Sequence, residues 1–400
     1  MAKQEAKAAV PRLRFPEFRK AQEWTVKPFA QLLTIGSGRD YKHLGSGSVP
    51  VYGSGGYMLS VDDYLYDGES ACIGRKGTIN NPIFLTGKFW TVDTLFYTHS
   101  FKECLPRFVF LHFQRIDWLK HNEAGGVPSL SKSSIEKIEV AVPHLAEQQK
   151  IADCLTSLDE VIAAQGRKVE ALKAHKRGLM QQLFPREGET RPRLRFPEFR
   201  DAPEWEPTDL GRLAEFRSGG TPSKADPQFW NGDIPWVSAK DMKTLRLGDA
   251  ADHITSVAVD NGAKLVPPGT LLMLTRGMTL LKDVPICIAG REMSFNQDVK
   301  ALFPKAKVRS DFLAFLLLAN KLRLLNMVDV AGHGTGKLDT DELKSFDLTI
   351  PNPKEQKRIA DCLSSLDTQI AAEANQFAAL KTHKQGLMQQ LFPAPNGATA

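Results

Sequence analysis

No run of apolar residues in this 400-residue sequence approaches the roughly 18 that a membrane-spanning helix requires. The longest run, residues 312–319, is less than half that length and predicts a buried helix. The first 14 residues (MAKQEAKAAVPRLR) contain no apolar core, so we expect no secretory signal. We therefore expect a cytoplasmic protein that makes no contact with a membrane.

Cysteine is scarce and shows no metal-binding pattern. The five cysteines have no C-x-x-C spacing, and an odd, scattered set is typical of reduced thiols in a cytoplasm. The nine histidines show no ligand spacing either. His175 and His383 occupy matching helix positions, which favours a structural role. We expect no metal site.

Catalytic motifs are also missing. No glycine-rich loop ends in Gly-Lys-Ser/Thr, so nucleotide hydrolysis is not indicated. An adenine methyltransferase would need an Asn/Asp-Pro-Pro-aromatic motif, and residues 81–84 (NPIF) lack the second proline. We find no nucleophile–base pair. The sequence predicts a non-catalytic binding subunit without a cofactor.

The chain does carry a modest positive charge, +6 with a pI near 8.9. This charge permits nucleic-acid binding without demanding it. The 42% hydrophobic and 24% charged residues are those of an ordinary globular protein.

The most informative feature is an internal repeat. Residues 11–19 (PRLRFPEFR) recur letter for letter at 192–200, and residues 147–185 recur in similar form at 355–393. The stretches between these repeats have diverged almost completely. Such a duplicated frame around unlike inserts suggests one scaffold that presents two recognition surfaces.

Each long repeat predicts a coiled-coil helix of about five heptads. The first apolar seam comprises Ile151, Leu155, Leu158, Ile162, Gln165, Val169, Leu172, Lys176, Leu179 and Leu183. The second seam breaks at the matching polar positions, Glu373 and Lys384. Because each insert precedes its helix, we expect the two helices to pair antiparallel.

The inserts, about 24–143 and 205–351, are rich in glycine, aromatic and β-branched residues. Short strands separated by glycine turns are predicted, including one over residues 89–97. The inserts realign at their ends, where residues 126–130 match 334–338. We expect one β-rich fold with a divergent face.

The order of these pieces resembles the specificity subunit of type I restriction-modification systems, over nearly the whole chain. The pieces that carry the resemblance are residues 51–56, 73–79, 90–94, 220–223, 230–236 and 294–298, with Glu147-Gln148 and Glu355-Gln356 opening the helices. The resemblance implies recognition of a bipartite double-stranded DNA target, one half per domain. It also implies two methyltransferase subunits and restriction/translocase subunits as partners.

The expected fold is α+β: two β-rich target-recognition domains separated by an antiparallel coiled coil, with pseudo-twofold symmetry. The expected segments are an N-terminal segment near the C-terminal helix end (1–20), the first domain (21–145), the first helix (146–185), a linker and repeat (186–200), the second domain (201–353), the second helix (354–393) and a tail (394–400).

Candidate DNA contacts lie in glycine-rich turns. Arg75, beside Lys76, can grip guanine O6 and N7 in the major groove, or lie in a solvated hairpin turn. Arg276, which directly precedes a glycine, is a similar candidate for a DNA contact. The loop with Thr221, Ser223 and Lys224 offers phosphate donors, or is an ordinary loop.

Further candidates lie in the matching ends of the inserts and in one turn of the first. Ser129, Lys132, Thr335 and Lys337 suit sequence-neutral phosphate contacts. Tyr52 and Ser54 complete the set, although Tyr52 suits a core as well as a base contact. Two other functions stay open, a self-sufficient DNA modification enzyme and a structural adaptor that does not bind DNA.

Overall fold

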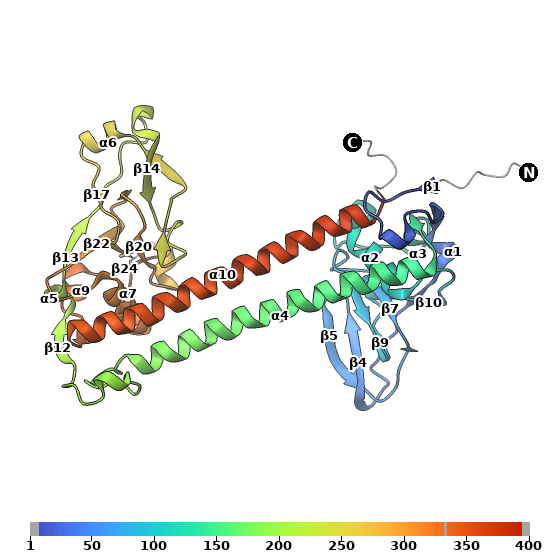
Figure 1. The fold of residues 1–400 in the computed structure, drawn as a ribbon, viewed down its shortest axis with the longest axis horizontal. Helices are drawn as coiled ribbons and strands as arrows, with labels where there is room; N and C mark the ends of the chain where they lie inside the picture. The colour runs from blue at the N-terminus through green and yellow to red at the C-terminus, as the bar shows by residue number, and fades with distance from the viewer. Residues whose placement is uncertain (1–7, 332–333, 394–400) are drawn as a thin grey trace, which may run out of the picture. The chain divides into compact units, whose positions relative to one another are not determined.

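The computed structural model describes residues 8–331 and 334–393, which form two compact units. The first contains the described residues up to Gly166 together with those from Asn375 onward, and the second spans Arg167–Ala374. Residues 1–7 and the expected tail, 394–400, lie outside the described residues. Figure 1 follows the chain through both units.

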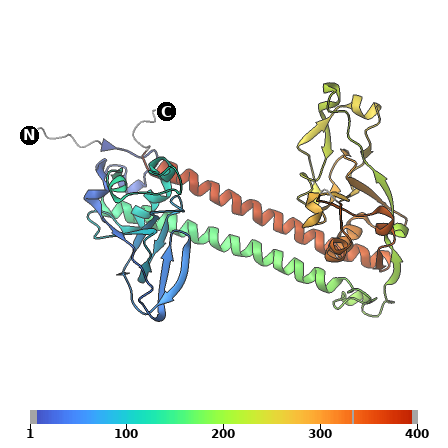
Figure 2. The same cartoon turned by 180° about the vertical axis from the view of Figure 1, so that it is seen from behind.

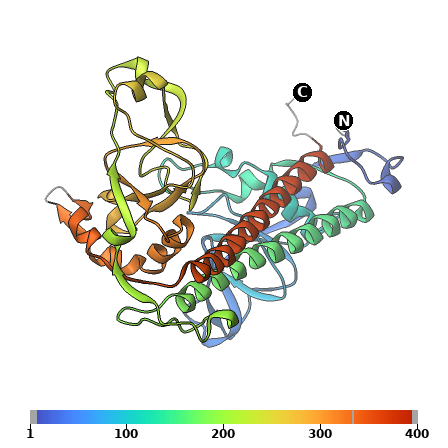
Figure 3. The same cartoon turned by 60° about the vertical axis from the view of Figure 1, so that its left-hand side comes forward.

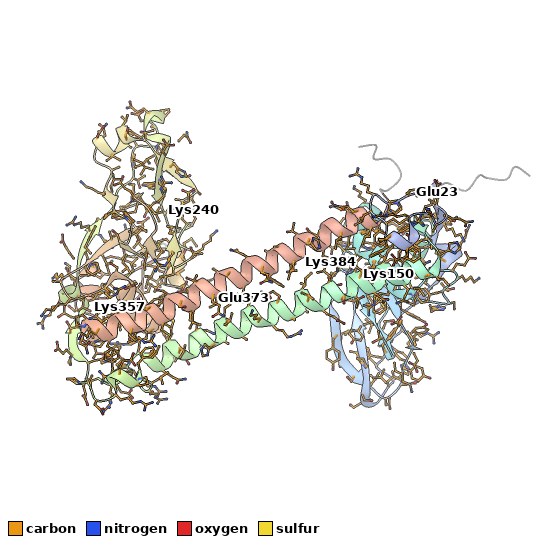
Figure 4. All side chains as sticks on the ribbon, in the orientation of Figure 1. Glu23, Lys150, Lys240, Lys357, Glu373 and Lys384 are labelled. Carbon is orange, nitrogen blue, oxygen red and sulfur yellow. The ribbon has the colours of Figure 1, made fainter. Side chains whose placement is uncertain are left out.

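Two helices of 39 residues each, α4 (Leu145–Leu183) and α10 (Pro353–Leu391), contribute to both units. All seam positions predicted from the heptads are buried or half-buried. In the first unit, Nζ of Lys384 in α10 lies 2.6 Å from Oδ1 of Asp159 in α4. Figure 4 labels Lys384 on α10. In the second, Nζ of Lys176 in α4 lies 2.5 Å from Oδ1 of Asp367 in α10.

These two ion pairs show the helix direction within each unit. The early part of α4 packs on the late part of α10, and the late part of α4 packs on the early part of α10 (Figures 1 and 3). The predicted antiparallel pairing is confirmed. The seam lysines, which break the apolar pattern, are therefore each neutralised by an aspartate of the facing helix.

A buried ionic cluster ties the N-terminal repeat to the start of α4. Arg14 donates from Nε to Oε1 of Glu147 at 2.7 Å and from Nη2 to Oε2 at 2.6 Å. The same guanidinium donates to the carbonyls of Ala21 and Gln22, and Trp24 Nε1 donates to Glu147. The carboxylate thus accepts three hydrogen bonds in a site that excludes water.

The second unit repeats this cluster atom for atom. Arg195 donates to both carboxylate oxygens of Glu355, at 2.8 and 2.7 Å, and also to the carbonyls of Ala202 and Pro203. Trp205 Nε1 donates to Glu355 at 3.3 Å, as Trp24 does to Glu147. The cluster explains why the repeats preserve an arginine, a tryptophan and the glutamate that opens each helix.

The same segments also contact the ends of the helices. The Leu13 amide donates to the Gln390 carbonyl at 2.9 Å in the first unit, and the Leu194 amide donates to the Gln182 carbonyl at 2.9 Å in the second. Phe15 packs against the core of the first unit and Phe196 against that of the second.

The first insert contains a central sheet in the order β3-β10-β7-β8 and a second sheet in the order β5-β4-β9-β6 (Figures 1 and 2). Their bounds are β3 Thr34–Ser37, β4 Ser46–Gly53, β5 Gly56–Val61, β6 Tyr66–Asp67, β7 Ser70–Gly74, β8 Ile83–Leu85, β9 Lys88–Thr91 and β10 Leu95–His99. Helix α2 (Pro106–Arg115) buries Phe108, Val109 and Phe113 in the core of this unit.

The insert is joined to its helix through a small sheet in the order β1-β2-β11. Its bounds are β1 Ala8–Ala9, β2 Trp24–Pro28 and β11 Glu139–Val142. In the second unit β12 (Glu206–Asp209) pairs with β25 (Asp347–Ile350) in the same way as β2 pairs with β11.

The second insert has the same arrangement of a central and a second sheet, with longer connections between the strands. Its central sheet runs β13-β22-β18-β20-β15 and its second sheet β16-β14-β21-β17. Their bounds are β13 Ala214–Ser218, β14 Trp230–Val237, β15 Arg246–Leu247, β16 Asp252–Ile254, β17 Leu265–Val266, β18 Leu271–Leu274, β20 Ile286–Ala289, β21 Met293–Phe295 and β22 Val299–Pro304. The predicted buried helix is α7 (Ser310–Ala319).

One strand prediction is wrong. Residues 89–97 form two strands, because the chain turns at residues 92–94 and passes from the second sheet to the central one. Both strands bury consecutive residues, and Val92 in the turn is buried as well, so the apolar pattern runs on through the turn. Periodicity alone therefore did not reveal the break.

Candidate nucleic-acid interface

The basic turn Arg75-Lys76-Gly77 leaves the buried end of β7 and is held by two other segments. The amides of Arg75 and Lys76 both donate to the Thr94 carbonyl, at 2.8 and 3.4 Å. On the other side Lys76 forms an antiparallel bridge with Ser129, flanked by a bond from the Gly77 amide to the Pro128 carbonyl. The structure thus brings Arg75, Lys76 and Ser129 together.

Both basic side chains of this turn are exposed. Arg75 donates from Nη1 to the Asp93 carbonyl at 3.4 Å, and its guanidinium lies 6.0 Å from the centre of the Phe96 ring. Within the described residues, no carboxylate forms an ion pair with Arg75 or Lys76. Their charges are therefore directed to solvent and available to an anion.

The second unit builds the same turn from Thr275-Arg276-Gly277, where Arg276 and Gly277 form β19. The amides of Thr275 and Arg276 both donate to the Asp298 carbonyl, at 2.8 and 3.2 Å. Arg276 pairs with Lys337 of β24 (Thr335–Lys337) and Gly277 with Gly336.

Both turns also contain a glycine with positive φ at the matching position. Gly77 has φ of +89° and Gly277 of +143°, a region that L side chains rarely adopt. The Leu130 amide donates to the Arg75 carbonyl at 2.8 Å, and the Leu338 amide donates to the Thr275 carbonyl at 2.9 Å. These bonds show that Lys76 in the first unit corresponds to Arg276 in the second, and that Arg75 corresponds to Thr275.

An open hollow of about 770 Å³ lies beside the first turn, lined by Asp40, Tyr41, Lys42, Asp93, Thr94 and residues 53–58. Ser54 reaches it, and its amide donates to Oγ1 of Thr94 at 3.4 Å. Tyr52 is half-buried, with its ring edge-on to Tyr57 at 6.1 Å, so it supports the wall of the hollow.

The loop with Thr221, Ser223 and Lys224 is exposed in the second unit. Thr221 hydrogen-bonds through Oγ1 to Gln297, which directly precedes Asp298. The Ser223 carbonyl accepts a bond from Trp230 Nε1 at 3.0 Å, and Lys224 lines a small hollow with Trp230 and Asp252. Thr221 is therefore linked to the basic turn, whereas Lys224 faces a different hollow.

Three remaining candidates lie in the matching ends of the inserts. Lys337 forms an ion pair with Asp339 at 3.2 Å, so part of its charge is offset. Thr335 is half-buried in β24, two residues before Lys337. Lys132 begins helix α3 (Lys132–Glu136). Burial, and to a lesser extent the charge of Lys132, hold the pKa of His99 below its ordinary value.

Sequence reasoning missed the exposed side chains of β5. Tyr57 is 63% exposed and Met58 48% exposed, and both line the hollow beside Arg75. They follow the glycine turn that joins β4 to β5, and this turn was visible in the sequence. It also missed Asp93 and Gln297, which occupy matching positions next to the two basic turns.

The described residues contain no group of three or more His, Cys, Asp or Glu side chains that could hold a metal ion. Burial raises the pKa of Cys72 and of Cys287 to about 12, so both stay protonated thiols near neutral pH. Burial likewise lowers the pKa of His112 to about 3, and this neutral ring bonds the Ala141 carbonyl. No helix of residues 8–331 and 334–393 is both long and apolar enough to cross a bilayer.

Comparison with known proteins identifies one family. The model of the type I restriction modification DNA specificity domain matches residues 21–174 and again 203–382. The specificity subunit of the Escherichia coli type I restriction enzyme EcoR124I/EcoR124II is 32% identical over 167 residues, 41% of each chain. That of the Methanocaldococcus jannaschii enzyme MjaVIII is 22% identical over 345 residues, covering 82% of this chain and 77% of the relative.

The alignment to the E. coli relative thus spans about two fifths of that protein's length. Among solved structures, the type I restriction-modification S subunit of M. genitalium matches with a TM-score of 0.66 at 14% identity, covering 97% of this chain and 100% of that one. A chain from a study of complex assembly and conformational transition in the type I system matches with a TM-score of 0.56 at 15% identity, covering 93% and 98%. At such identities the likeness concerns the fold.

Proposed function

This chain belongs to the type I restriction-modification DNA specificity family, and we propose that it is the non-catalytic subunit that selects the DNA target of such a complex. Each unit would recognise one half of a bipartite duplex site. The observation that carries the proposal is the pair of matching basic turns, displayed by two inserts that otherwise differ.

The proposed contact surface includes the residues singled out above in both units. In the first unit these are Tyr52, Ser54, Arg75, Lys76, Ser129 and Lys132. In the second they are Thr221, Ser223, Lys224, Arg276, Thr335 and Lys337. Exposed cations beside hydroxyl groups are the chemistry that binds phosphates, and arginine suits guanine edges.

The proposed partners are duplex DNA, two methyltransferase subunits and restriction/translocase subunits. A solved structure from a type I assembly shares this fold, which supports membership in a complex. The proposed substrate is cellular DNA, so the proposed place of action is the cytoplasm. No metal or cofactor of its own is proposed for this chain.

The decisive experiment maps methylated sites in cells that carry this chain with its methyltransferase partners. We expect modification at one bipartite sequence. Exchange of residues 24–143 for another domain of the family should change one half of that sequence and leave the other unchanged. If both halves change together, the units do not read DNA independently.

A second assay separates the alternative functions. The purified chain with S-adenosylmethionine or ATP should neither methylate nor cut DNA, and turnover would favour a self-sufficient enzyme. The chain assembled with its methyltransferase partners should bind the mapped site more tightly than a random duplex. Absence of binding to either duplex would favour a structural adaptor that does not bind DNA.

A further inference from the structure

The basic turns of the two units share one cation and differ in the residue before it. Four matching backbone interactions show that Lys76 of the first unit corresponds to Arg276 of the second. The sequence alone does not align them, because their residue numbers differ by 200 whereas the flanking repeats are offset by 181 and 208. Both side chains are exposed, and neither forms an ion pair with a described carboxylate. Arg75 and Thr275 fill the preceding place with unlike chemistry.

Two half-sites of unlike sequence share only their sugar-phosphate backbone. A positive charge that both units present at the same backbone position therefore suits a contact that every half-site offers. We propose that Lys76 and Arg276 are sequence-neutral phosphate anchors, whereas Arg75 is a residue that reads bases in the first half-site. This inference rests on the proposed function and assigns separate roles within its surface.

The setting of the anchors supports a phosphate role. Each anchor is fixed on both sides, by the Thr94 or Asp298 carbonyl and by the facing strand segment, so its Cα position is well defined. In the second unit Arg276 lies opposite Lys337, whose charge is partly offset by the ion pair with Asp339. Arg276 forms no ion pair with a described carboxylate, so its charge is the one left for an anion.

The setting of the preceding residue supports a reading role in one unit only. Thr275 is 4% exposed, and its hydroxyl donates to the Asp298 carbonyl at 3.1 Å, so it is turned inward. Arg75 is exposed and donates to the carbonyl of Asp93, which lines the hollow together with Tyr57. Among the described residues the Arg75 guanidinium donates one long hydrogen bond, at 3.4 Å, so it can reorient toward a guanine edge.

The test uses the full chain assembled with its methyltransferase partners and duplexes that carry the mapped site or a random sequence. Affinity is measured by fluorescence anisotropy between 50 and 200 mM salt for Lys76→Gln and Arg276→Gln. Each lost phosphate contact lowers the salt slope by about 0.9. The ratio of wild-type to variant affinity should therefore fall about 3.5-fold as the salt concentration rises across this range. The fall should be equal on both duplexes.

Three controls make the result specific. Lys76→Arg keeps the charge and should keep the slope. Lys137→Gln removes an exposed lysine elsewhere in the first unit, so it makes the same charge change and should leave the slope unaltered. Thermal unfolding of each variant should match the wild type, because the substituted side chains are exposed.

Arg75→Gln has a different expected outcome. Selection from duplexes randomised in the first half-site should yield relaxed preference at one or two positions, with the second half-site unchanged. Altered base preference in Lys76→Gln, an unchanged salt slope in both anchor variants, or unchanged preference in Arg75→Gln would overturn the inference. A wild-type complex that does not distinguish the mapped site from random DNA would instead overturn the proposed function.

Discussion

Replacing Glu147 by Gln tests whether the buried cluster fixes the N-terminal repeat to α4. The substitution preserves the shape of the side chain and removes its charge, leaving the Arg14 guanidinium, 9% exposed, beside a neutral amide. Two charge-assisted hydrogen bonds are weakened, each worth roughly 1.5–3 kcal/mol, and removal of one partner of a buried pair costs about 3–5 kcal/mol. Because Arg14 keeps two carbonyl acceptors, we expect a loss of about 3 kcal/mol, near the lower limit.

Hydrogen–deuterium exchange of peptides that cover residues 11–24 and 192–205 measures this loss in each unit. Glu147→Gln should accelerate exchange of the first peptide about a hundredfold, since roughly 1.4 kcal/mol corresponds to a factor of ten. Glu355→Gln is the matched variant, because Arg195 and Trp205 surround it in the same way. It should accelerate only the second peptide, by a similar factor.

Two further variants decide whether the charge is the cause. Arg14→Met combined with Glu147→Leu removes both charges and should recover most of the stability, because a buried pair is often replaceable by apolar residues. Glu17→Gln removes the exposed partner of Lys150 and should leave exchange unchanged. Equal exchange in Glu147→Gln and the wild type would refute the reasoning.

Two other predictions follow from matched positions. Burial lowers the pKa of His112 to about 3, so this ring binds a proton more readily in the unfolded chain than in the folded one. The free energy of unfolding of the first unit should therefore fall by about 2 kcal/mol from pH 7 to pH 5. The amides that precede α2 and α7, of Leu105 and Arg309, donate to the matching side chains of Gln148 and Gln356, which aligns His112 with Leu316. His112→Leu should remove this contribution in urea unfolding, and the second unit should lack it. Gly178→Ala and Gly386→Ala fill open space on α4 and α10, so each should raise the free energy of unfolding by up to about 1 kcal/mol, and a loss would mean that the helix surface is covered.

The duplicated frame was predictable because its signals are local and repeated. Heptad spacing predicted α4 and α10, and the order of inserts and helices predicted their antiparallel pairing, which the Lys176–Asp367 and Lys384–Asp159 pairs confirm. The reason for the preserved Glu147 was not predictable. Its partners Arg14 and Trp24 are more than 120 residues away, and only the folded chain brings them together.

The match between the two basic turns was also beyond sequence reasoning. The alignment breaks inside each insert, because the second insert carries longer loops and a different number of strands. The tryptophans illustrate the difficulty: Trp90 and Trp236 lie on different strands, yet their indole nitrogens donate to the matching carbonyls of Arg39 and Gly220, both at 2.9 Å. Backbone hydrogen bonds, and not side-chain identity, reveal which residues correspond.

The repeat makes one covalent rearrangement predictable. In the second unit, Pro185 is followed by four residues and then Thr190, whose carbonyl accepts a bond from the Trp205 amide. In the first unit, Pro393 and Ala9 line one hollow. Ala9 pairs with Trp24 in the same way as Thr190 pairs with Trp205 in the second unit, so Ala9 corresponds to Thr190. Four residues should therefore suffice to join Pro393 to Ala9.

A permutant joined by a copy of residues 186–189 and opened at Gly188, which is exposed with φ of +77°, should keep the wild-type unfolding midpoint and the same bipartite site. The new link repeats one that the fold already accommodates, and the cut removes a link whose neighbouring segment stays anchored by the Arg195–Glu355 cluster. Methylated-site sequencing of cells that carry the permutant measures the site. Loss of one half-site with unchanged stability would show that the linker itself takes part in recognition, and a lower midpoint would show that the two ends of the frame are not equivalent.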